Sequence, residues 1–384
     1  MLYRDFGKTG LQLSNLGFGI MRLPIIDNDT ERIDEEKALP MIRYAIDQGV
    51  NYIDTAWPYH GGKSEEFCAK VLKNGYREKV RIGTKLPCWE MKQQSDMNVY
   101  LDKQLERLEV DQIDLYLLHS LGADSWKTMK EFDYYSFLDD AKKSGKIKYA
   151  GFSFHDNLDV FEDIVDDYDW DFCFIQLNFL DFDYQAGVRG LKYAHKKGMG
   201  VMLMEPLRGG MLARTEVPSE IQAIWEQADQ ARTPAEWALR AVWNLPETSV
   251  VLSGMASMEQ VVENVKIASE AEPGSLTGKE LSLIEKATRA FRERISVDCT
   301  NCRYCMPCPA GVNIPELFWA LNHAALFDDH EKARFWVNDF LKAEERPSAC
   351  VECGECEEHC PQNIPIRKTL REIGERYEDN VNPL

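Results

Sequence analysis

The sequence predicts a (β/α)8 barrel, the TIM-barrel class of α/β fold, followed by a small, mainly α-helical domain rich in cysteine. Eight short, apolar, β-rich runs alternate with longer segments of helical periodicity between residues 14 and 268, and eight of the eleven cysteines lie between Cys299 and Cys360. Strands that alternate with helices form parallel sheets, and eight of them fit a closed barrel better than an open sheet. No Gly-x-Gly-x-x-Gly run follows a strand and opens a helix, so an open dinucleotide-binding sheet lacks its main support.

The elements of the barrel follow from this alternation. The expected strands cover residues 16–21, 51–55, 80–85, 113–119, 149–154, 172–178, 200–205 and 249–253. The stretches between them are amphipathic, with apolar residues at helical spacing. The expected helices cover residues 36–48, 63–73, 99–108, 135–144, 158–166, 185–197 and 235–245. The barrel therefore takes up residues 1–270.

The remainder of the chain divides into a connection and a second domain. Residues 271–275 read Ala-Glu-Pro-Gly-Ser, which is the composition of a linker, and a charged helix is expected near residues 279–294. Two further helical patterns, at residues 316–325 and 331–340, separate two groups of cysteines. We therefore expect a linker and helix over residues 271–294 and a separate domain over residues 295–384.

The composition excludes several classes of protein. With 384 residues, of which 44% are hydrophobic and 28% charged, the chain is typical of a globular protein with a sizeable core. Sixty-four acidic and 45 basic residues give a net charge of −19, which argues against binding to nucleic acid or to an anionic membrane. No apolar run approaches the roughly 20 residues that span a bilayer, and residues 1–5 have no signal-peptide pattern. We therefore expect a cytoplasmic protein.

The crowded cysteines form two runs with the spacing of iron–sulfur ligands. The first run is Cys299-x2-Cys302-x2-Cys305-x2-Cys308-Pro, and the second is Cys350-x2-Cys353-x2-Cys356-x3-Cys360-Pro. The second spacing is the ferredoxin pattern for a [4Fe–4S] cluster, and the first is one residue shorter before its last cysteine. A tight Cys-x2-Cys-x2-Cys loop points three thiolates at three irons, so the fourth iron takes a cysteine from elsewhere in the chain.

In two-cluster proteins that fourth cysteine comes from the other run. We therefore expect two [4Fe–4S] clusters, one on Cys299, Cys302, Cys305 and Cys360 and the other on Cys350, Cys353, Cys356 and Cys308. A pair of four-cysteine zinc sites is the alternative, although zinc needs two Cys-x2-Cys pairs rather than two triplets. The scattered Cys68, Cys88 and Cys173 stand in apolar contexts, where we expect core thiols.

Four polar residues fall where the chemistry of a barrel is placed. Asp54, Lys85 and His119 end the second, third and fourth expected strands, and Tyr59 lies in the loop after Asp54. Each residue alone fits a structural role, but the set suits reduction of a carbonyl group. A tyrosine can protonate the developing alkoxide if a neighbouring lysine lowers its pKa of about 10, and an aspartate can hold that lysine. A histidine can orient the carbonyl oxygen by a hydrogen bond.

These residues lie in stretches that resemble the aldo-keto reductase family. The matching stretches are residues 6–11 (FGKTGL), 51–59 (NYIDTAWPY), 83–85 (GTK), 115–119 (LYLLH) and 151–153 (GFS). The resemblance covers about residues 3–268, and the tail from about residue 295 resembles a two-cluster ferredoxin-like domain. It implies a (β/α)8 barrel with a catalytic tetrad of Asp54, Tyr59, Lys85 and His119, in which Tyr59 is the proton donor.

The same resemblance implies a nicotinamide cofactor, usually NADPH, bound without a Rossmann fold. Gly19, Ile20 and Met21 would line the nicotinamide end, Ser153 and Gln176 would hold the carboxamide, and Gly254, Gln260, Glu263 and Asn264 would lie near the adenosine half.

Departures from the family pattern leave the choice between NADPH, NADH and a flavin open. Phe154 follows Ser153 where the family often has Asn, and Met204 stands where a tyrosine often stacks on the nicotinamide. Basic residues that would grip a 2′-phosphate are replaced near Gly254, which removes a charge-assisted contact. Arg208 either replaces these basic residues as a ligand of the phosphate or only caps a loop. Flavins on barrels often have no visible motif, so the sequence does not exclude one.

The two parts of the chain handle electrons differently, because a hydride moves two at once and a cluster passes one. We expect an oxidoreductase that reduces a carbonyl-like small molecule at the barrel mouth, with electrons from NAD(P)H or from the clusters. A ferredoxin-type carrier is its expected protein partner. Two alternatives stay open: an iron–sulfur sensor or electron-transfer subunit whose barrel binds nicotinamide or flavin without turnover, and a carbonyl reductase stabilised by zinc.

Overall fold

The computed structural model describes residues 1–27 and 29–379, which form two compact units. The first unit contains Met1–Pro206 and Ala238–Leu276, and the second contains Leu207–Trp237 and the chain from Thr277 onward. The segment of residues 207–237 groups with the C-terminal part, although it lies between two barrel strands in the sequence. The expected domain boundaries at residues 270 and 294 stay a prediction.

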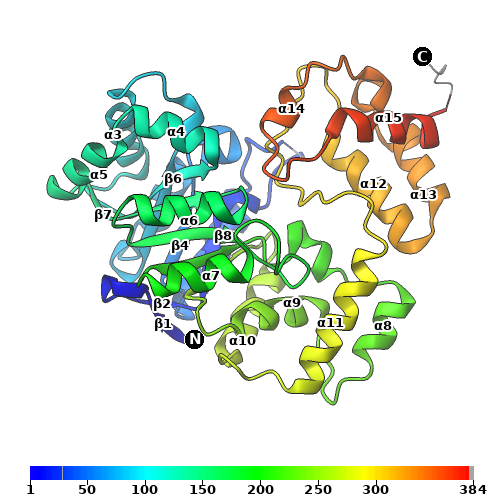
Figure 1. Cartoon of the computed structure of the whole chain (residues 1–384), viewed down its shortest axis with the longest axis horizontal. Helices are drawn as coiled ribbons and strands as arrows, with labels where there is room; N and C mark the ends of the chain where they lie inside the picture. The colour runs from blue at the N-terminus through cyan, green and yellow to red at the C-terminus, as the bar shows by residue number, and fades with distance from the viewer. Residues whose placement is uncertain (28, 380–384) are drawn as a thin grey trace. The chain divides into compact units, whose positions relative to one another are not determined.

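The first unit is a closed barrel of eight parallel strands, which confirms the predicted fold (Figure 1). Around the barrel the strand order is β10-β3-β4-β5-β6-β7-β8-β9, so strands that are neighbours in the chain pair with each other. The strands are β3 Leu16–Gly19, β4 Tyr52–Asp54, β5 Arg81–Leu86, β6 Ile113–Leu121, β7 Ile147–Phe154, β8 Phe172–Gln176, β9 Gly200–Met204 and β10 Val250–Gly254. All eight coincide with expected strands, and their ends differ by at most two residues.

The interior of the barrel is packed with side chains and is not a channel. Leu115 and Leu117 of β6 and Phe172 and Phe174 of β8 are fully or almost fully buried in one apolar cluster with Tyr52 of β4. Residues two apart on a strand point to the same face, which explains why these pairs share the interior. Bulky side chains from alternate strands form the layers that hold such a barrel together.

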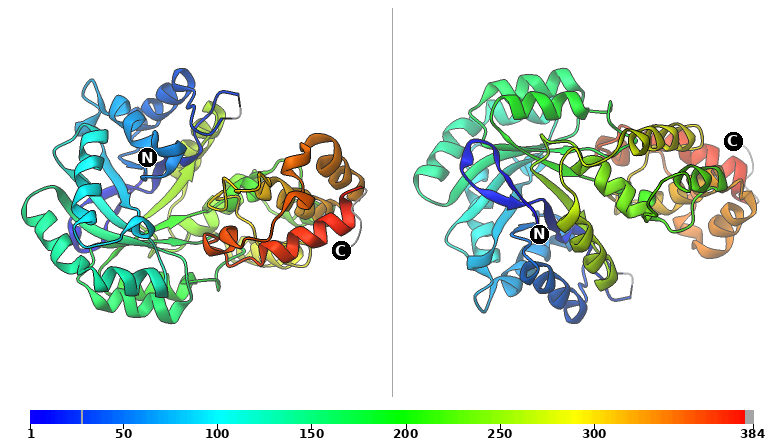
Figure 2. Two further views of the ribbon diagram at one scale, coloured as in Figure 1. Left: turned by 90° about the horizontal axis from the view of Figure 1, so that it is seen from above. Right: turned by 90° about the horizontal axis from the view of Figure 1, so that it is seen from below.

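Helices cover the outside of the strands, as both views in Figure 2 show. They are α1 Glu35–Asp47, α2 Ser64–Leu72, α3 Asp96–Leu108, α4 Ala123–Glu131, α5 Tyr134–Lys143, α6 Leu158–Asp167, α7 Gly187–Lys196, α9 Pro234–Trp243 and α10 Met258–Glu270. Helix α6 is typical: the Asn157 side chain caps its first turn by accepting from the Val160 N–H, and Phe161, Ile164 and Val165 form its buried stripe. Helices α4 and α10 lie outside the helices expected from the sequence.

A hairpin that the sequence analysis did not predict precedes the barrel. Strands β1 (Tyr3–Asp5) and β2 (Gln12–Ser14) pair antiparallel, and Phe6 between them is buried in the barrel interior. A Cβ atom on Gly7 would lie 2.3 Å from the Gly200 backbone nitrogen, and Gly7 also has φ +52°. Only glycine lets the chain approach the first residue of β9 so closely.

The second unit is helical around an apolar core of its own. Its helices are α8 Ser219–Trp225, α11 Gly278–Arg292, α12 Ile314–Phe327, α13 His330–Phe335, α14 Glu355–Glu358 and α15 Ile366–Tyr377, with a π-helical turn at Trp336–Phe340. Helices α12, α13 and α15 lie side by side (Figure 1). Leu317, Val337 and Ile373 from three of these segments are buried together, and several cysteines pack against this core. In the part of the chain that the structure describes, no helix is long and apolar enough to cross a membrane.

Arg4 of β1 ties the N-terminal hairpin to the end of helix α9. Its guanidinium donates hydrogen bonds to the carbonyl oxygens of Trp243 and Thr248, at 2.7 Å each, and of Leu245 at 3.3 Å. Trp243 ends the helix, in the turn whose carbonyls have no partner within the helix, and Leu245 and Thr248 lie in the segment that follows. Burial lowers the pKa of Arg4 to about 10, so the side chain keeps its charge at neutral pH.

We expect Arg4→Leu to lower the free energy of unfolding of the barrel by about 2–3 kcal/mol, because it leaves several carbonyls without their charged donor. Urea unfolding followed by tryptophan fluorescence measures this loss. The matched control is Arg32→Leu, since Arg32 forms an exposed ion pair with Asp27 at 2.8 Å and should change stability by less than about 0.5 kcal/mol. Equal effects of the two substitutions would contradict the role assigned to Arg4.

Candidate active site and metal centre

The structure brings the four expected catalytic residues to one end of the barrel. Asp54 is the last residue of β4, Lys85 is the last but one of β5, and His119 lies near the end of β6. The three strands are neighbours, and the carboxyl ends of parallel strands meet at the same rim. Tyr59 opens the short helical turn η3 (Tyr59–Gly62) that follows β4.

A buried ion pair between Lys85 and Asp54 is the centre of this arrangement. The Lys85 Nζ lies 2.5 Å from Asp54 Oδ2 and 2.7 Å from the carbonyl oxygen of Thr55. The side chains of Lys85 and Asp54 are 2% and 1% exposed, so the pair is removed from water. The Tyr59 ring centroid lies 5.0 Å from the same Nζ. The ammonium group thus has Asp54 as its counter-ion and Tyr59 as its aromatic neighbour.

Burial and the attraction between the two charges shift the pKa values of this pair in opposite directions. Burial raises the pKa of the Asp54 carboxyl and lowers the pKa of the Lys85 ammonium, while their mutual attraction and hydrogen bond oppose both shifts. A buried charge without its partner destabilises a protein strongly. Each member of the pair therefore depends on the other to remain charged.

The loop that carries Tyr59 has a left-handed backbone and is anchored by His60. His60 has φ +52°, followed by Gly61 with φ +60°. The two ring nitrogens of His60 lie 2.8 and 3.1 Å from the carbonyl oxygens of Thr30 and Ile20. Sequence analysis did not single out His60. Its position directly after the candidate proton donor was the available signal.

His119 is kept neutral by its surroundings. It is 3% exposed, its ring centroid lies 6.1 Å from that of Tyr59, and the planes of the two rings are 81° apart. Burial, together with the nearby Lys85 and His155, holds the pKa of His119 well below its usual range. The ring therefore carries no charge at neutral pH, which suits a group that orients a carbonyl oxygen. A register irregularity in β6 between Leu118 and Leu121 lies at this residue, as β-bulges often do near sites.

A buried polar network lies behind Lys85 and was not expected from the sequence. The Gln104 side-chain amide donates to the Lys85 carbonyl oxygen at 2.9 Å and to Glu65 Oε1 at 2.7 Å. Thr84 also donates to Glu65, and the hydroxyl of Tyr116 donates to Gln104. A signal was present, because Gln104 falls on the buried stripe of α3 among apolar residues. This network fixes the backbone of β5 next to the reactive lysine.

The residues expected at the nicotinamide end lie at the same rim. Gly19 ends β3 opposite Gly254 of β10, and Ile20 and Met21 begin the short turn η2 (Ile20–Arg22). Ser153 is buried in β7, and its hydroxyl oxygen accepts from the Ser120 N–H at 2.7 Å. Gln176 ends β8, is buried, and donates to Asp181 at 3.1 Å.

The residues expected near the adenosine half lie around the loop between β10 and α10. Gln260 and Asn264 hold this loop, because Gln260 accepts from the Ala256 N–H at 2.8 Å and Asn264 donates to Ser253 Oγ at 3.0 Å. Glu263 lies between them on α10 and is half-buried. A Cβ atom on Gly254 would lie 3.2–3.3 Å from carbon atoms of Arg22.

Arg22 is therefore a cation beside Gly254 that sequence analysis did not include. The residue directly follows the expected run of Gly19, Ile20 and Met21, which was the only available signal. Its proximity to Gly254 depends on the closure of β10 onto β3. Arg22 is thus a basic residue close to Gly254 that comes from another part of the chain.

Two departures from the family pattern, Phe154 and Met204, and the possible substitute ligand Arg208 have defined surroundings in the structure. Phe154 packs against Phe161 of α6 with ring centroids 5.1 Å apart, so it belongs to the layer between strands and helices. Met204 ends β9 and packs against the apolar barrel interior. Arg208 is 3% exposed and forms a short ion pair with Asp298 within the second unit. Arg208 thus has a structural counter-ion.

The four thiols expected to hold one cluster surround a cavity in the second unit. Cys299, Cys302, Cys305 and Cys360 line one pocket. Apolar side chains that include Ile314, Phe318, Ile364 and Ile366 complete its walls. Burial, together with the thiols of Cys299 and Cys360, raises the pKa of Cys305 to about 12. Four thiols around a mainly apolar space fit an iron–sulfur cluster.

The other four thiols also act on one another at short range. Burial, followed by Glu357 and the thiols of Cys308, Cys350 and Cys353, raises the pKa of Cys356 to about 11. Among the described residues, no three His, Cys, Asp or Glu side chains are grouped as ligands of a metal ion. A [4Fe–4S] cluster binds each cysteine through a different iron, so its thiols stand farther apart than those on a single ion. The crosswise division of the eight cysteines stays a prediction.

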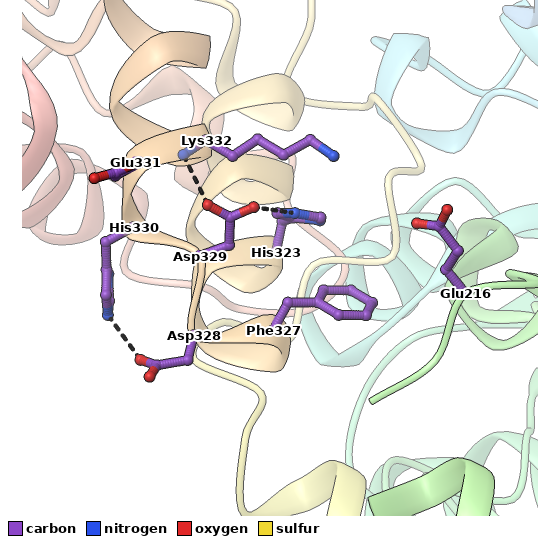
Figure 3. Close-up of a pocket in the computed structure, with 8 residues that line it drawn as sticks. All are labelled: Glu216, His323, Phe327, Asp328, Asp329, His330, Glu331 and Lys332. Carbon is purple, nitrogen blue, oxygen red and sulfur yellow. Dashed lines mark hydrogen bonds and ion pairs between the residues drawn. The ribbon is translucent and has the colours of Figure 1, made fainter. Parts of the chain in front are cut away.

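A second hollow in this unit is lined mainly by charged residues (Figure 3). It has a volume of about 590 Å³ and is open to solvent. His323 lies 3.6 Å from Asp329, and His330 lies 3.4 Å from Asp328, so the imidazoles and carboxylates face each other in pairs. We assign no ligand to this hollow, because it is open and its lining points to no particular ligand.

Two family models match the chain. The model described as "Aldo/keto reductase family" matches residues 15–288, and the model described as "4Fe-4S dicluster domain" matches residues 298–364. Together they cover the barrel and both runs of cysteines. Iron–sulfur ligation of the C-terminal domain is thereby supported over the zinc alternative, whereas the flavin alternative gains no support.

Individual relatives match the barrel. The L-galactose dehydrogenase of Arabidopsis thaliana is 28% identical over 73% of this chain and 92% of its own length. The NADH-specific methylglyoxal reductase of Escherichia coli (strain K12) is 26% identical over 67% of this chain and 91% of its own. Among solved structures, the holo form of the aldo-keto reductase AKR11C1 from Bacillus halodurans is 27% identical with a TM-score of 0.63, covering 75% of this chain and 96% of that one.

The crosswise division of cysteines is tested by removing one long-range ligand at a time. We expect Cys360→Ser and Cys308→Ser each to lower the iron content of the anaerobically reconstituted protein from about eight to about four atoms per chain. Iron analysis measures the loss, and paramagnetic resonance shows which signal disappears. Cys173→Ser is the control, because Cys173 is a buried thiol of β8. Cys299→Ser should remove the same signal as Cys360→Ser. If it instead removes the signal that is lost in Cys308→Ser, the crosswise division is contradicted.

Proposed function

Because the chain belongs to the aldo/keto reductase family and carries a 4Fe-4S dicluster domain, it is an oxidoreductase, and we propose that it reduces the carbonyl group of a small molecule at the barrel rim. The main support for this proposal is that one buried ammonium group lies close to two other residues of the site. Lys85 Nζ lies 2.5 Å from Asp54 and 5.0 Å from the ring centroid of Tyr59. A lysine in this position stabilises the phenolate form of the tyrosine, which is what a phenol needs to act as an acid near pH 7.

The proposed reaction uses each of the four residues once. A nicotinamide held by the rim residues would supply the hydride for the carbonyl carbon. Tyr59 gives its proton to the carbonyl oxygen, and Lys85 stabilises the phenolate that is left. Asp54 keeps Lys85 charged and in place. Neutral His119 donates a hydrogen bond that orients the oxygen and favours the charge that develops on it.

The names of the relatives support both directions of this reaction. One relative is named a dehydrogenase and another a reductase. Oxidation of an alcohol uses the same groups in reverse, with Tyr59 accepting the proton. We propose reduction as the forward reaction because the chain also carries a domain for one-electron carriers.

The cofactor is proposed to be NADPH or NADH. Gly19, Ile20, Met21, Ser153 and Gln176 would hold the nicotinamide, as their positions at the rim allow. Gly254, Gln260, Glu263 and Asn264 would border the adenosine half, with Met204 beside the nicotinamide ring. Arg22 next to Gly254 offers a positive charge for a phosphate group, whereas the relative in Escherichia coli is named NADH-specific. The first observation favours NADPH and the second favours NADH.

We further propose that the C-terminal domain exchanges single electrons with a ferredoxin-type carrier. Two clusters can together hold two electrons, one each, which they would take from or pass to the carrier. The eight cysteines stand in cluster spacing on the same chain as the complete tetrad, and a dicluster model matches them. If the barrel served only as a sensor, the four residues of the tetrad would have no catalytic function.

We expect Tyr59→Phe to lower kcat for carbonyl reduction by about 10²–10⁴-fold, because it removes the general acid. The measurement is oxidation of NADPH and of NADH with methylglyoxal and a panel of small aldehydes. Binding of the nicotinamide, followed by fluorescence, should be unchanged. Tyr193→Phe is the control, since the Tyr193 hydroxyl donates to Asp166 on the helical surface at 2.9 Å. Unchanged turnover in Tyr59→Phe would favour the sensor or electron-transfer subunit.

Electron exchange by the clusters is tested on the anaerobically reconstituted chain. We expect clusters reduced by dithionite to be reoxidised by oxidised ferredoxin, with loss of their paramagnetic signals. The titration is followed by absorbance and by paramagnetic resonance. If the clusters bind but no carrier, nicotinamide or substrate changes their oxidation state, their role is structural and the electron-transfer part of the proposal fails.

A further inference from the structure

We propose that Tyr52 is a positioning residue that fixes the carboxylate of Asp54 and, through it, sets the acidity of Tyr59. This inference rests on the proposed function. The Tyr52 hydroxyl donates to Asp54 Oδ1 at 2.8 Å, and Lys85 lies 2.5 Å from Asp54 Oδ2. Both oxygens of the carboxylate are therefore engaged from opposite sides. A carboxylate held at one oxygen alone is free to rotate away from its partner.

The barrel is built to receive the Tyr52 ring and its hydroxyl. Tyr52 and Asp54 are two apart on β4, so their side chains point to the same interior face. A Cβ atom on Gly83 of β5 would lie 2.3 Å from the Tyr52 hydroxyl oxygen. A Cβ atom on Gly17 of β3 would lie 2.9 Å from the ring carbon Cδ1. Glycines on both neighbouring strands thus make room for this tyrosine, and the clash at Gly83 concerns the hydroxyl itself.

The buried hydroxyl is a permanent donor. Tyr52 is fully buried, and burial, followed by the charge of Asp54, raises its pKa well above the usual range. The hydroxyl therefore keeps its proton at every pH at which the protein works. A hydrogen bond donated to a carboxylate favours the ionised form and is stronger than one between neutral groups. Tyr52 thus opposes the tendency of burial to protonate Asp54.

Tyr52 acts on Tyr59 indirectly, through the charges of Asp54 and Lys85. Without the Tyr52 hydroxyl, the ionised form of Asp54 is less favoured, so Lys85 loses part of the negative charge that stabilises its ammonium form. A weaker positive charge at Lys85 stabilises the Tyr59 phenolate less. The pKa of Tyr59 should therefore rise when Tyr52 loses its hydroxyl. Among the other titratable groups nearby, Asp114 acts on Tyr52 and Glu65 acts on Lys85. Asp54 in turn acts on Cys68, and Lys85 acts on His119.

The test is Tyr52→Phe in the full chain, because phenylalanine keeps the ring between the two glycines. We expect kcat for carbonyl reduction to fall about tenfold, which is the loss of one hydrogen bond to a charged group. KM should stay within about twofold, since Tyr52 touches neither substrate nor cofactor in the proposed site. The limb of the pH–rate profile that reports ionisation of Tyr59 should move to higher pH. An unchanged profile and an unchanged kcat would overturn the inference.

A second readout requires no substrate. Ultraviolet difference titration of the wild type against Tyr59→Phe isolates the ionisation of Tyr59 from that of the other tyrosines. The same difference between Tyr52→Phe and the double variant reports that ionisation without the Tyr52 hydroxyl. We expect the Tyr59 transition at higher pH in the second pair. Coincident transitions would show that Tyr52 only packs the barrel.

Tyr134→Phe is the matched control. The Tyr134 hydroxyl is buried and donates to Asp167 at 2.8 Å, so this substitution also removes a hydrogen bond from a tyrosine to an aspartate, at a helix outside the strands. It should lower stability and leave the Tyr59 titration and the pH–rate profile unchanged. The outcomes separate the two proposals. If Tyr59→Phe abolishes turnover and Tyr52→Phe does not alter it, the positioning role fails while the proposed function stands; if Tyr59→Phe retains full turnover, the proposed function fails.

Discussion

The buried pair of Lys85 and Asp54 is the interaction on which the rest of the barrel rim depends. Two opposite charges on side chains that are 2% and 1% exposed lose their hydration, and only close mutual contact and further hydrogen bonds compensate for this loss. The chain provides these contacts from β4, from the residue that follows it and from helix α3. Thr55 accepts from the ammonium, Tyr52 donates to the carboxylate, and Gln104 fixes the backbone of Lys85. The position of Lys85 beside Tyr59, the proposed proton donor, follows from the need to keep this buried ion pair in contact.

The second unit meets a different constraint with a core of its own. Helices α12, α13 and α15 bury their apolar faces together, and cysteines from both runs pack against that core. Thiols brought together from distant parts of the chain repel one another when ionised, which adds to the effect of burial and raises the pKa of Cys305 and Cys356. Iron relieves this repulsion, so cluster assembly and the fold of this unit support each other.

Much of the site was predictable because the relevant signals are local. A strand is a short apolar run, and the residue that ends it in a parallel barrel faces the rim, which places Asp54, Lys85 and His119 without further information. Residues that act through another part of the chain had no such signal. Arg22 reaches Gly254 only because β10 closes onto β3, and His60 anchors the Tyr59 loop through carbonyls at Thr30 and Ile20. The N-terminal hairpin was also missed, since its strands have three residues each.

The sequence by itself determined the class of barrel, the four polar residues at its rim and the eight cysteines with cluster spacing, because periodicity and spacing are properties of the chain. The tertiary structure decided which side chains are buried together, away from water. It placed Tyr52 between Gly17 and Gly83 with its hydroxyl on Asp54, and it paired Arg208 with Asp298. Whether a buried charge has a partner depends on atoms that are distant in the chain and a few ångströms apart in space, and only the folded chain brings them together.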